Sequence, residues 1–270
     1  MIGRTSSRAR AAGRARGRAP AVARMSRGGA ARPQALAALL LTLCVAASVA
    51  AVSACGSTVA PPHVPAKRIL FIGNSFTSYN GGIGAQLKGL APTATTGAVM
   101  AGGFTLEKHW NAGAALREIR SGRWDYVVLQ EQSQTPVIAA SLFAKYAGAF
   151  DTEIRAAGGK SVLLMTWERP DSVQYKVTTP YLAAAYSQTG AAIGATVAPA
   201  GLAFATALRE RPGLVLNSAD GHPTPAGTYL AACVLYGTIY GRSPVGNPFG
   251  PPSAGDRTFL QEVAARTLGL

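Results

Sequence analysis

Ser75 is the residue of this chain best placed for nucleophilic chemistry. It directly follows the apolar run 68–72 and a Gly-Asn pair, so a predicted strand delivers it into a tight turn. A serine oxygen is a weak nucleophile near neutral pH unless a base takes its proton, and imidazole has the matching pKa. The chain has three histidines, and His63 lies among prolines. His109 and His222 are therefore the candidate bases.

Asp220 stands two residues before His222, in an Asp-Gly-His-Pro segment directly ahead of a long amphipathic stretch. A carboxylate beside an imidazole holds the ring in the useful tautomer and stabilises the imidazolium that forms. Taken singly, Ser75 would be a turn serine or a helix cap, and the Asp220–His222 pair a plain turn. Taken together, they predict a nucleophile, a base and its orienting acid. His109, on a predicted helix, is interpreted as a packing or surface histidine.

Short apolar runs alternate with helical patterns and must position these residues. The predicted strands are 68–73, 95–100, 125–130, 161–166 and 195–199. The runs 126–129 and 162–165 are apolar without alternation, as expected for strands buried on both faces. The clearest helical patterns are 137–157, 179–190 and 225–240. This order predicts right-handed βαβ units, and hence a three-layer α/β/α domain with a parallel, flavodoxin-like sheet of about five strands.

In such a sheet the ligand site lies beyond the carboxyl ends of the strands. Ser75 follows the first predicted strand, 102–103 the second, and 130–134 the third. We therefore expect these segments to converge on one edge, and 167–170, after the fourth strand, could line the same pocket. Nothing in the sequence requires the 220–222 loop to join them, although a loop just before the last long helix could.

These motifs resemble the SGNH/GDSL-type hydrolases, a family of single-domain α/β/α serine esterases and lipases. The resemblance covers about 67–240 and rests on four phrases. They are Gly-Asn-Ser-Phe-Thr at 73–77, Trp-Asp-Tyr-Val-Val-Leu-Gln at 124–130, Tyr-Leu-Ala-Ala at 229–232, and the Asp-Gly-His-Pro segment. The phrases are similar to a bacterial branch whose substrates are mostly unassigned. The resemblance implies Ser75 as nucleophile, His222 as general base, Asp220 as its orienter, and no cofactor.

The chain departs from the family pattern in two places. The family usually has two residues between the acid and the histidine, whereas Gly221 alone stands here. The family's third block offers Gly-x-Asn-Asp, whose asparagine donates to the oxyanion, whereas 129–134 reads Leu-Gln-Glu-Gln-Ser-Gln. A glutamine amide can donate the same hydrogen bond. We assign this role to Gln130, at the strand end, with Gln132 and Gln134 as rivals.

The remaining oxyanion donors would be backbone N–H groups. Ser75 can give its own, from the turn that leads into the next helix. Gly103, or its neighbour Gly102, can give another because glycine lets the backbone approach a substrate closely. An ordinary loop before a helix capped by Thr105 explains the two glycines equally well.

Residues 1–54 are predicted to be an export signal. The first 34 residues hold nine arginines and no acid, and 35–52 carry no charge. That order of a basic and an apolar region is typical of a signal peptide. The Val-Ser-Ala-Cys ending resembles the lipobox of bacterial lipoproteins, which implies cleavage before Cys55 and lipidation of its thiol. We expect a small, polar, proline-bearing tether over 55–66 and a hydrolase domain over 67–270. A signal peptide cut near Ala54 and a retained membrane helix are alternatives, and Met1 and Met25 both remain possible starts.

Charge and cysteine content narrow the possible partners. The net charge of +14 comes largely from the leader, and residues 35–270 carry 17 basic against 12 acidic side chains. No basic stripe is visible there, so we expect no nucleic-acid partner. No Cys/His cluster has metal-ligand spacing, so we expect no metal and no cofactor. The oligomeric state stays open.

The sequence thus predicts a lipid-anchored enzyme of the cell envelope that cleaves carboxylic esters. Its expected substrate is a short acyl group, such as O-acetyl, on a saccharide-like molecule, and the reaction would pass through an acyl-enzyme. A lipase or lysophospholipase of the same family is one alternative, although no apolar lid is evident. A non-catalytic envelope lipoprotein that keeps the fold as a binding module is the other.

Overall fold

The computed structural model describes residues 64–251 and 253–270. The predicted export signal, Cys55 and nearly all of the predicted tether lie outside these residues. The strands are β1 (Arg68–Gly73), β2 (Thr95–Met100), β3 (Tyr126–Leu129), β4 (Lys160–Leu164) and β5 (Thr196–Ala198). The helices are α1 (Ser75–Ser78), α2 (Ile83–Leu90), α3 (Leu106–Ala112), α4 (Ala114–Ser121), α5 (Thr135–Ile138), α6 (Ala140–Ala156), α7 (Thr179–Ile193), α8 (Ala200–Glu210), α9 (Pro225–Tyr240) and α10 (Ala254–Leu268). Short 3₁₀ turns span Tyr79–Gly81 and Val173–Tyr175.

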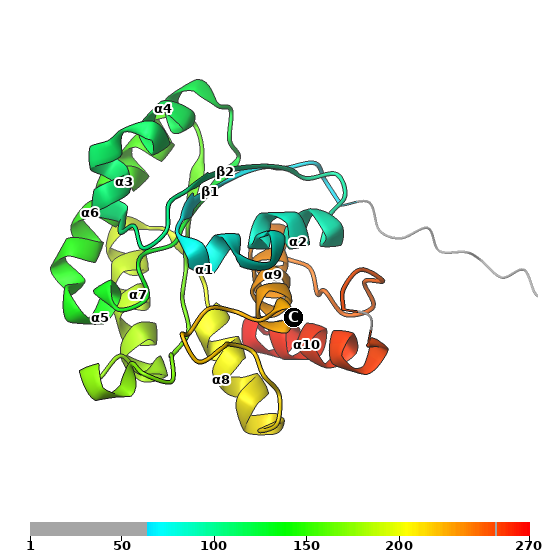
Figure 1. Cartoon of the computed structure of the whole chain (residues 1–270). Helices are drawn as coiled ribbons and strands as arrows, with labels where there is room; N and C mark the ends of the chain where they lie inside the picture. Colours follow the sequence, from blue (N-terminus) through cyan, green and yellow to red (C-terminus); the bar gives the residue numbers. More distant parts are fainter. Residues whose placement is uncertain (1–63, 252) are drawn as a thin grey trace, which may run out of the picture. The chain divides into compact units, whose positions relative to one another are not determined.

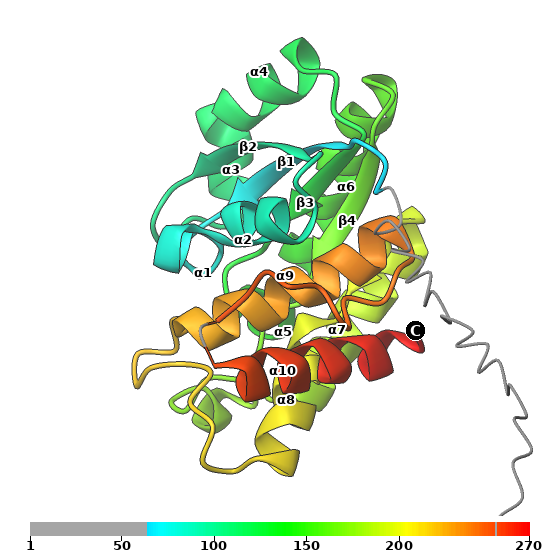
Figure 2. The ribbon, with the colours of Figure 1, turned by 90° about the vertical axis from the view of Figure 1, so that its right-hand side faces the viewer.

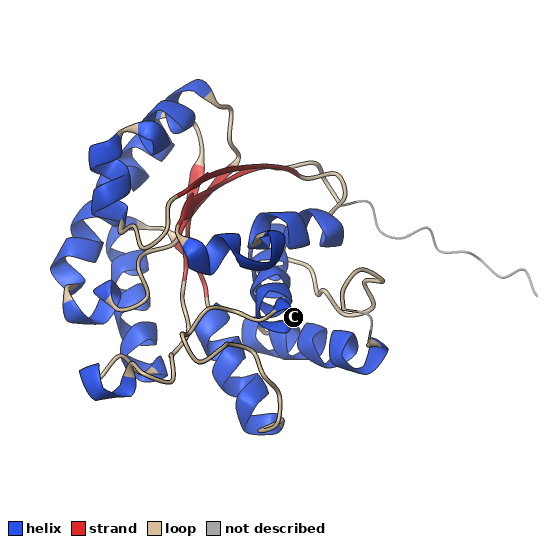
Figure 3. Cartoon of the chain, viewed as in Figure 1, coloured by secondary structure: helices blue, strands red, loops and turns tan. Residues whose placement is uncertain are grey.

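The five strands form one parallel sheet in the order β2-β1-β3-β4-β5. Figure 3 shows the sheet in red, with blue helices on both sides. This order is the flavodoxin-like one, and it confirms the predicted α/β/α fold class. The strand order changes direction at β1, because β2 is added on one side of it and β3 on the other. The carboxyl end of β1, where Ser75 begins α1, is therefore the switch point at which such sheets bind ligands.

Each face of the sheet has its own apolar core. Successive residues of a strand point to opposite faces, so Ile69 and Phe71 of β1 pack on one side, while Leu70 and Ile72 pack on the other. Helices α2, α8, α9 and α10 cover the first face, and α3, α4, α6 and α7 cover the second (Figure 1). Burial on both faces explains why the central strands β1, β3 and β4 contain continuous apolar runs.

Helix α9 is the centre of the first layer. It is buried along almost its whole length, because α2 and the sheet lie on one side and α10 packs along the other (Figure 2). Thr224 caps its start by accepting a hydrogen bond from the backbone N–H of Gly227, and Pro225 occupies the first turn. Both features are typical helix starts. The loop that carries His222 therefore ends on a firmly fixed helix.

Some helix boundaries differ from the predicted ones. The predicted helix 137–157 is split, because Ala139 leaves the helical conformation (φ −142°, ψ 53°) between α5 and α6. Helix α7, predicted over 179–190, has Thr178 at its N-cap and runs on to Ile193. Within 64–251 and 253–270, no helix is both long and apolar enough to cross a membrane.

Candidate active site

The turn after β1 fixes the position of Ser75. Asn74 caps helix α1, since its Oδ1 accepts from the N–H of Phe76 at 3.1 Å and its Nδ2 donates to the carbonyl of Phe104 at 2.9 Å. Gly73 must be a glycine, because a Cβ atom there would lie 2.6 Å from Oε1 of Gln130. Ser75 is the first residue of the helix, at the carboxyl edge of the sheet.

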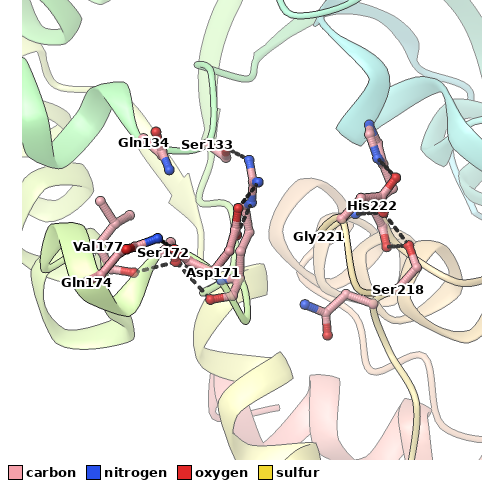
Figure 4. A network of polar contacts seen from close by, with 12 residues as sticks. Ser133, Gln134, Asp171, Ser172, Gln174, Val177, Ser218, Gly221 and His222 are labelled. Carbon is pink, nitrogen blue, oxygen red and sulfur yellow. Dashed lines mark hydrogen bonds and ion pairs between the residues drawn. The ribbon is translucent and has the colours of Figure 1, made fainter.

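The structure brings Ser75, His222 and Asp220 together. Nε2 of His222 lies 2.8 Å from Oγ of Ser75, and Nδ1 lies 2.9 Å from Oδ2 of Asp220. The single intervening residue, Gly221, has a left-handed φ of +83°, and this tight turn lets the carboxylate reach the ring. Figure 4 shows His222 with its polar neighbours Ser218 and Gly221. The short spacing noted in the sequence is therefore compatible with an acid–imidazole pair.

Asp220 is held in its ionised form. Hydrogen bonds from the hydroxyl of Ser218 (2.6 Å) and from the ring and backbone N–H of His222 keep its pKa well below the usual range. An ionised carboxylate only accepts hydrogen bonds. Nδ1 of a neutral His222 therefore donates to Asp220, and Nε2 is left to accept the proton of Ser75.

Aromatic rings fix the imidazole in place. The ring of Tyr79 stacks on that of His222, with centroids 4.0 Å apart and an interplanar angle of 10°. Phe76 packs at the same ring from a second direction, at 5.3 Å, and stacks in turn on Trp167. The indole N–H of Trp167 donates to the carbonyl of Gly221 at 3.1 Å. Sequence reasoning missed Tyr79, because nothing in its spacing from Ser75 distinguishes it from other exposed aromatics.

A pocket of about 240 Å³ opens beside Ser75 and His222. Its other main lining residues are Gly103, Gln132, Ser133 and Arg169. Gly103 has a left-handed φ of +68°. Within 64–251 and 253–270, no protein acceptor takes the backbone N–H of Gly103 or of Ser75. Two donors are therefore available at the pocket, as an oxyanion hole needs.

Gln130 does not fit the oxyanion role predicted for it. Its side chain is buried, and Oε1 accepts from the backbone N–H of Asn74 (2.9 Å) and the hydroxyl of Thr77 (3.0 Å). Its amide nitrogen donates to the carbonyl of Glu131. Gln130 thus ties β3 to the nucleophile turn. The prediction was wrong because the side chain of Gln130, the residue after β3, faces the turn that carries Ser75 and does not line the pocket.

Gln132 is the glutamine at the pocket. Its Oε1 accepts from the backbone N–H groups of Gln134 and Thr135 and from the Thr135 hydroxyl, at 2.9 to 3.2 Å. With the oxygen so occupied, the Nε2 group is the end left for a ligand, and its one protein contact is a long one, 3.4 Å to Ser133 Oγ. Gln134 does not line the pocket but stands at the N-cap of α5.

Two further titratable residues lie buried under the site. Nε2 of His109 donates to the carbonyl of Gly73 at 2.8 Å, and burial lowers the pKa of the ring. Glu131 accepts from the N–H of Leu106, at the start of α3, and from that of Gln132. Burial raises the pKa of Glu131 to about 7. His109 is therefore a buried structural residue and not a second base at the pocket.

Comparison with solved structures places this geometry in a family. A protein from Slackia heliotrinireducens described as an SGNH hydrolase is 30% identical, with a TM-score of 0.57, and the match covers 65% of this chain and 100% of that one. This chain belongs to the SGNH hydrolase family. It is therefore an ester-bond hydrolase, as the sequence predicted. Neither a scan against protein families nor a search of curated proteins gave a match.

More distant structures share the SGNH hydrolase fold alone. A DUF4886 family protein from Bacteroides uniformis is 17% identical, with a TM-score of 0.61, over 76% of this chain and 95% of that one. The acetyl xylan esterase AlAXEase is 14% identical, with a TM-score of 0.50, over 64% of this chain and 99% of that one. Within 64–251 and 253–270 of this SGNH hydrolase, no three His, Cys, Asp or Glu residues gather as metal ligands.

Proposed function

We propose that this SGNH hydrolase removes short acyl groups, such as O-acetyl, from a saccharide-like substrate through an acyl-enzyme. The observation that carries the proposal is the continuous chain of contacts from Ser75 through His222 to Asp220, with 2.8 and 2.9 Å between the polar atoms. An activated serine at the edge of a small polar pocket is what ester hydrolysis requires.

In the proposed mechanism, the hydroxyl of Ser75 attacks the ester carbonyl while His222 takes its proton. The oxyanion that forms would accept from the backbone N–H groups of Ser75 and Gly103 and from the amide of Gln132. Protonated His222 then gives its proton to the leaving alcohol, and the acyl group stays on Ser75. A water molecule, deprotonated by His222, releases the acid. Loss of one such oxyanion donor typically costs about 3 kcal/mol of transition-state stabilisation.

The preference for a short acyl group rests on the size and lining of the pocket. A volume of about 240 Å³ is below the range of roughly 300–1,000 Å³ usual for pockets that enclose drug-sized ligands. Its lining is rich in polar side chains, including Gln132, Ser133 and Arg169. Such groups suit the hydroxyls of a sugar better than a lipid tail.

A lipase is the second candidate, favoured by a separate apolar groove. This groove of about 310 Å³ runs between α2 and β2, includes Phe71, Ala85 and Met100, and begins at Ser78 of the same short helix as Ser75. It could take a long acyl chain. A series of p-nitrophenyl esters separates the two candidates: acetate is cleaved fastest by the proposed enzyme, and esters of eight or more carbons by a lipase.

The test of the mechanism is p-nitrophenyl acetate hydrolysis by the full chain and its Ser75→Ala variant. Because the members of a triad act as a unit, Ser75→Ala and His222→Ala should each lower kcat by about a thousandfold or more. Ser187→Ala, an exposed serine of α7, is the matched control and should keep wild-type activity.

A fluorophosphonate probe gives an independent readout. It reacts with activated serines, so it should label the wild-type chain and not Ser75→Ala. An unlabelled wild type together with equal rates in wild type and Ser75→Ala would instead support the binding-module alternative.

A further inference from the structure

Arg169 is a pocket residue that the proposed mechanism leaves without a role. It follows β4 and lines the pocket together with Ser75, Ser133 and His222. Its guanidinium makes three hydrogen bonds: Nε to Oδ1 of Asp171 at 2.9 Å, Nη2 to Oδ2 of Asp171 at 2.6 Å, and Nη1 to Oγ of Ser133 at 3.2 Å. Figure 4 shows Ser133 and Asp171 in this network, across from His222.

The network has hydrogen-bond donors to spare. A guanidinium carries five N–H groups, and Nη1 and Nη2 carry two each. Within 64–251 and 253–270, the three hydrogen bonds of Arg169 leave one N–H on each of these nitrogens without a protein acceptor. The hydroxyl of Ser133 accepts from Arg169 and from Gln132, and none of the described residues accepts its own hydrogen.

The guanidinium is also held still before any ligand arrives. Its side chain is only 18% exposed, and its aliphatic stem passes within 2.6 Å of the position that a Cβ on Gly221 would occupy. The backbone N–H of Arg169 donates to Oγ of Ser172, a buried residue whose hydroxyl also contacts the carbonyls of Arg169 and Val177. A donor that is ordered in advance loses little entropy when it binds.

We propose that Arg169, with Ser133 and Asp171, binds hydroxyl groups of the sugar that carries the ester. This inference rests on the proposed function and names the part of the substrate that lies beyond the scissile bond. The acyl group would lie against the N–H donors of Ser75 and Gly103. The sugar would lie against the Arg169 network, whose residues follow β3 and β4.

The charges of the network favour a neutral polyol over an acidic sugar. Asp171 already compensates Arg169 through a two-pronged ion pair, so an incoming carboxylate would meet the negative charge of Asp171 as well. A hydroxyl group both donates and accepts. It can accept from Arg169 or Ser133 and donate to a remaining lone pair of Asp171, whose side chain is 47% exposed.

The experiment measures kcat/KM of the full chain for two acetyl esters. One is p-nitrophenyl acetate, whose leaving group has no hydroxyls, and the other is a neutral methyl glycoside with one O-acetyl group. In Arg169→Met, the ratio of the glycoside value to the aryl value should fall about tenfold to a hundredfold, the usual effect of losing hydrogen bonds to a charged donor. Arg209→Met, an exposed arginine of α8, is the matched control and should leave both values unchanged.

A second variant guards against simple misfolding of the first. Asp171→Asn keeps the size of an exposed side chain but removes the charge that compensates Arg169. It should move the preference toward an O-acetylated methyl glucuronide, an acidic sugar ester, by about tenfold relative to the neutral glycoside.

An unchanged glycoside-to-aryl ratio in Arg169→Met overturns the sugar-binding role while leaving the proposed esterase intact. A wild type that already prefers the glucuronide, and loses that preference in Arg169→Met, overturns the assignment to neutral sugars. A wild type that cleaves neither p-nitrophenyl acetate nor the acetylated glycoside, and that the fluorophosphonate probe does not label, overturns the proposed function. The sugar-binding inference is then overturned as well.

Discussion

Gln130 and Gln132 stand two positions apart but contribute to the site in different ways. Gln130 joins the end of β3 to the turn that carries Ser75, through hydrogen bonds to Asn74 and Thr77. Gln132 lines the pocket, with its oxygen held by the first residues of α5. Glu131, between them, is buried and accepts from the N–H of Gln132. Protonation of this one carboxyl therefore acts directly on the pocket-lining loop.

We predict that Glu131 makes stability depend on pH. Its pKa is raised to about 7 in the folded chain, from an ordinary 4.5. The contribution of Glu131 to stability is thus fully present below pH 4.5 and is lost as the pH rises through 7. Glu131→Gln should remove about 3 kcal/mol of pH dependence between pH 4 and pH 8. Urea unfolding of both proteins at the two pH values measures this.

Glu262→Gln, in α10, is the matched control for this measurement, because the Glu262 side chain is 46% exposed, and it should follow the wild type at both pH values. Loss of a hydrogen bond in Glu131→Gln adds an offset that is the same at every pH. A difference between wild type and Glu131→Gln that stays constant from pH 4 to pH 8 would contradict the buried-carboxyl account.

At the scale of elements, the loop that leads into α9 sets the geometry of the acid and the base. An isolated bridge between Asn217 and Pro223 closes it, and a backbone hydrogen bond from Ser218 to the carbonyl of His222 spans it. Gly221 stands at its tip with φ at +83°. Since the indole of Trp167 also donates to Gly221, the loop is held to the end of β4 as well as to α9.

Gly221→Ala adds a single methyl group, yet it should lower esterase activity strongly. The left-handed φ is energetically unfavourable for alanine. The Cβ of alanine would also lie 2.6 Å from Cγ of Arg169. A local strain of about 1–3 kcal/mol that displaces Asp220 from His222 should lower kcat for p-nitrophenyl acetate about tenfold to a hundredfold. Gly213→Ala, with open space around the new atom and no left-handed φ, is the control. A wild-type kcat in Gly221→Ala would show that the turn tolerates another residue.

Sequence patterns predicted the sheet better than the loops. The bounds of β1, β2 and α9 coincide with the predicted ranges. The buried apolar run of β1 and the Thr-Pro start of α9 are strong local signals, whereas β2 lies at the edge of the sheet and has no buried residue. The break at Ala139 carries no such signal, since alanine is a good helix former. The choice between Gln130 and Gln132 was also beyond the sequence, because it depends on where one residue after a strand end points.

At the scale of the whole molecule, the site belongs to a domain that we expect to be tethered. The predicted lipid anchor, Cys55, precedes the described residues. Cys55→Ala should move the protein from the membrane fraction to the soluble fraction, measured by fractionation of cells that express the full chain. Cys44→Ala, in the apolar part of the predicted signal, is the matched control and should stay with the membrane. Equal membrane retention in both variants would contradict lipidation at Cys55.

The contact between Ser75 and His222 joins positions 147 residues apart in the chain. Ser75 depends on the first strand, and His222 on a loop that is anchored by the next-to-last helix. Any continuous fragment that contains both groups and these supports must include β1 to β5, because β2 to β5 lie between the first strand and that loop. A chain synthesised from its N-terminus therefore cannot cleave esters until the loop with His222, in its last third, has folded. Onset of ester cleavage during refolding would thus report the moment at which the His222 loop docks on the turn after β1.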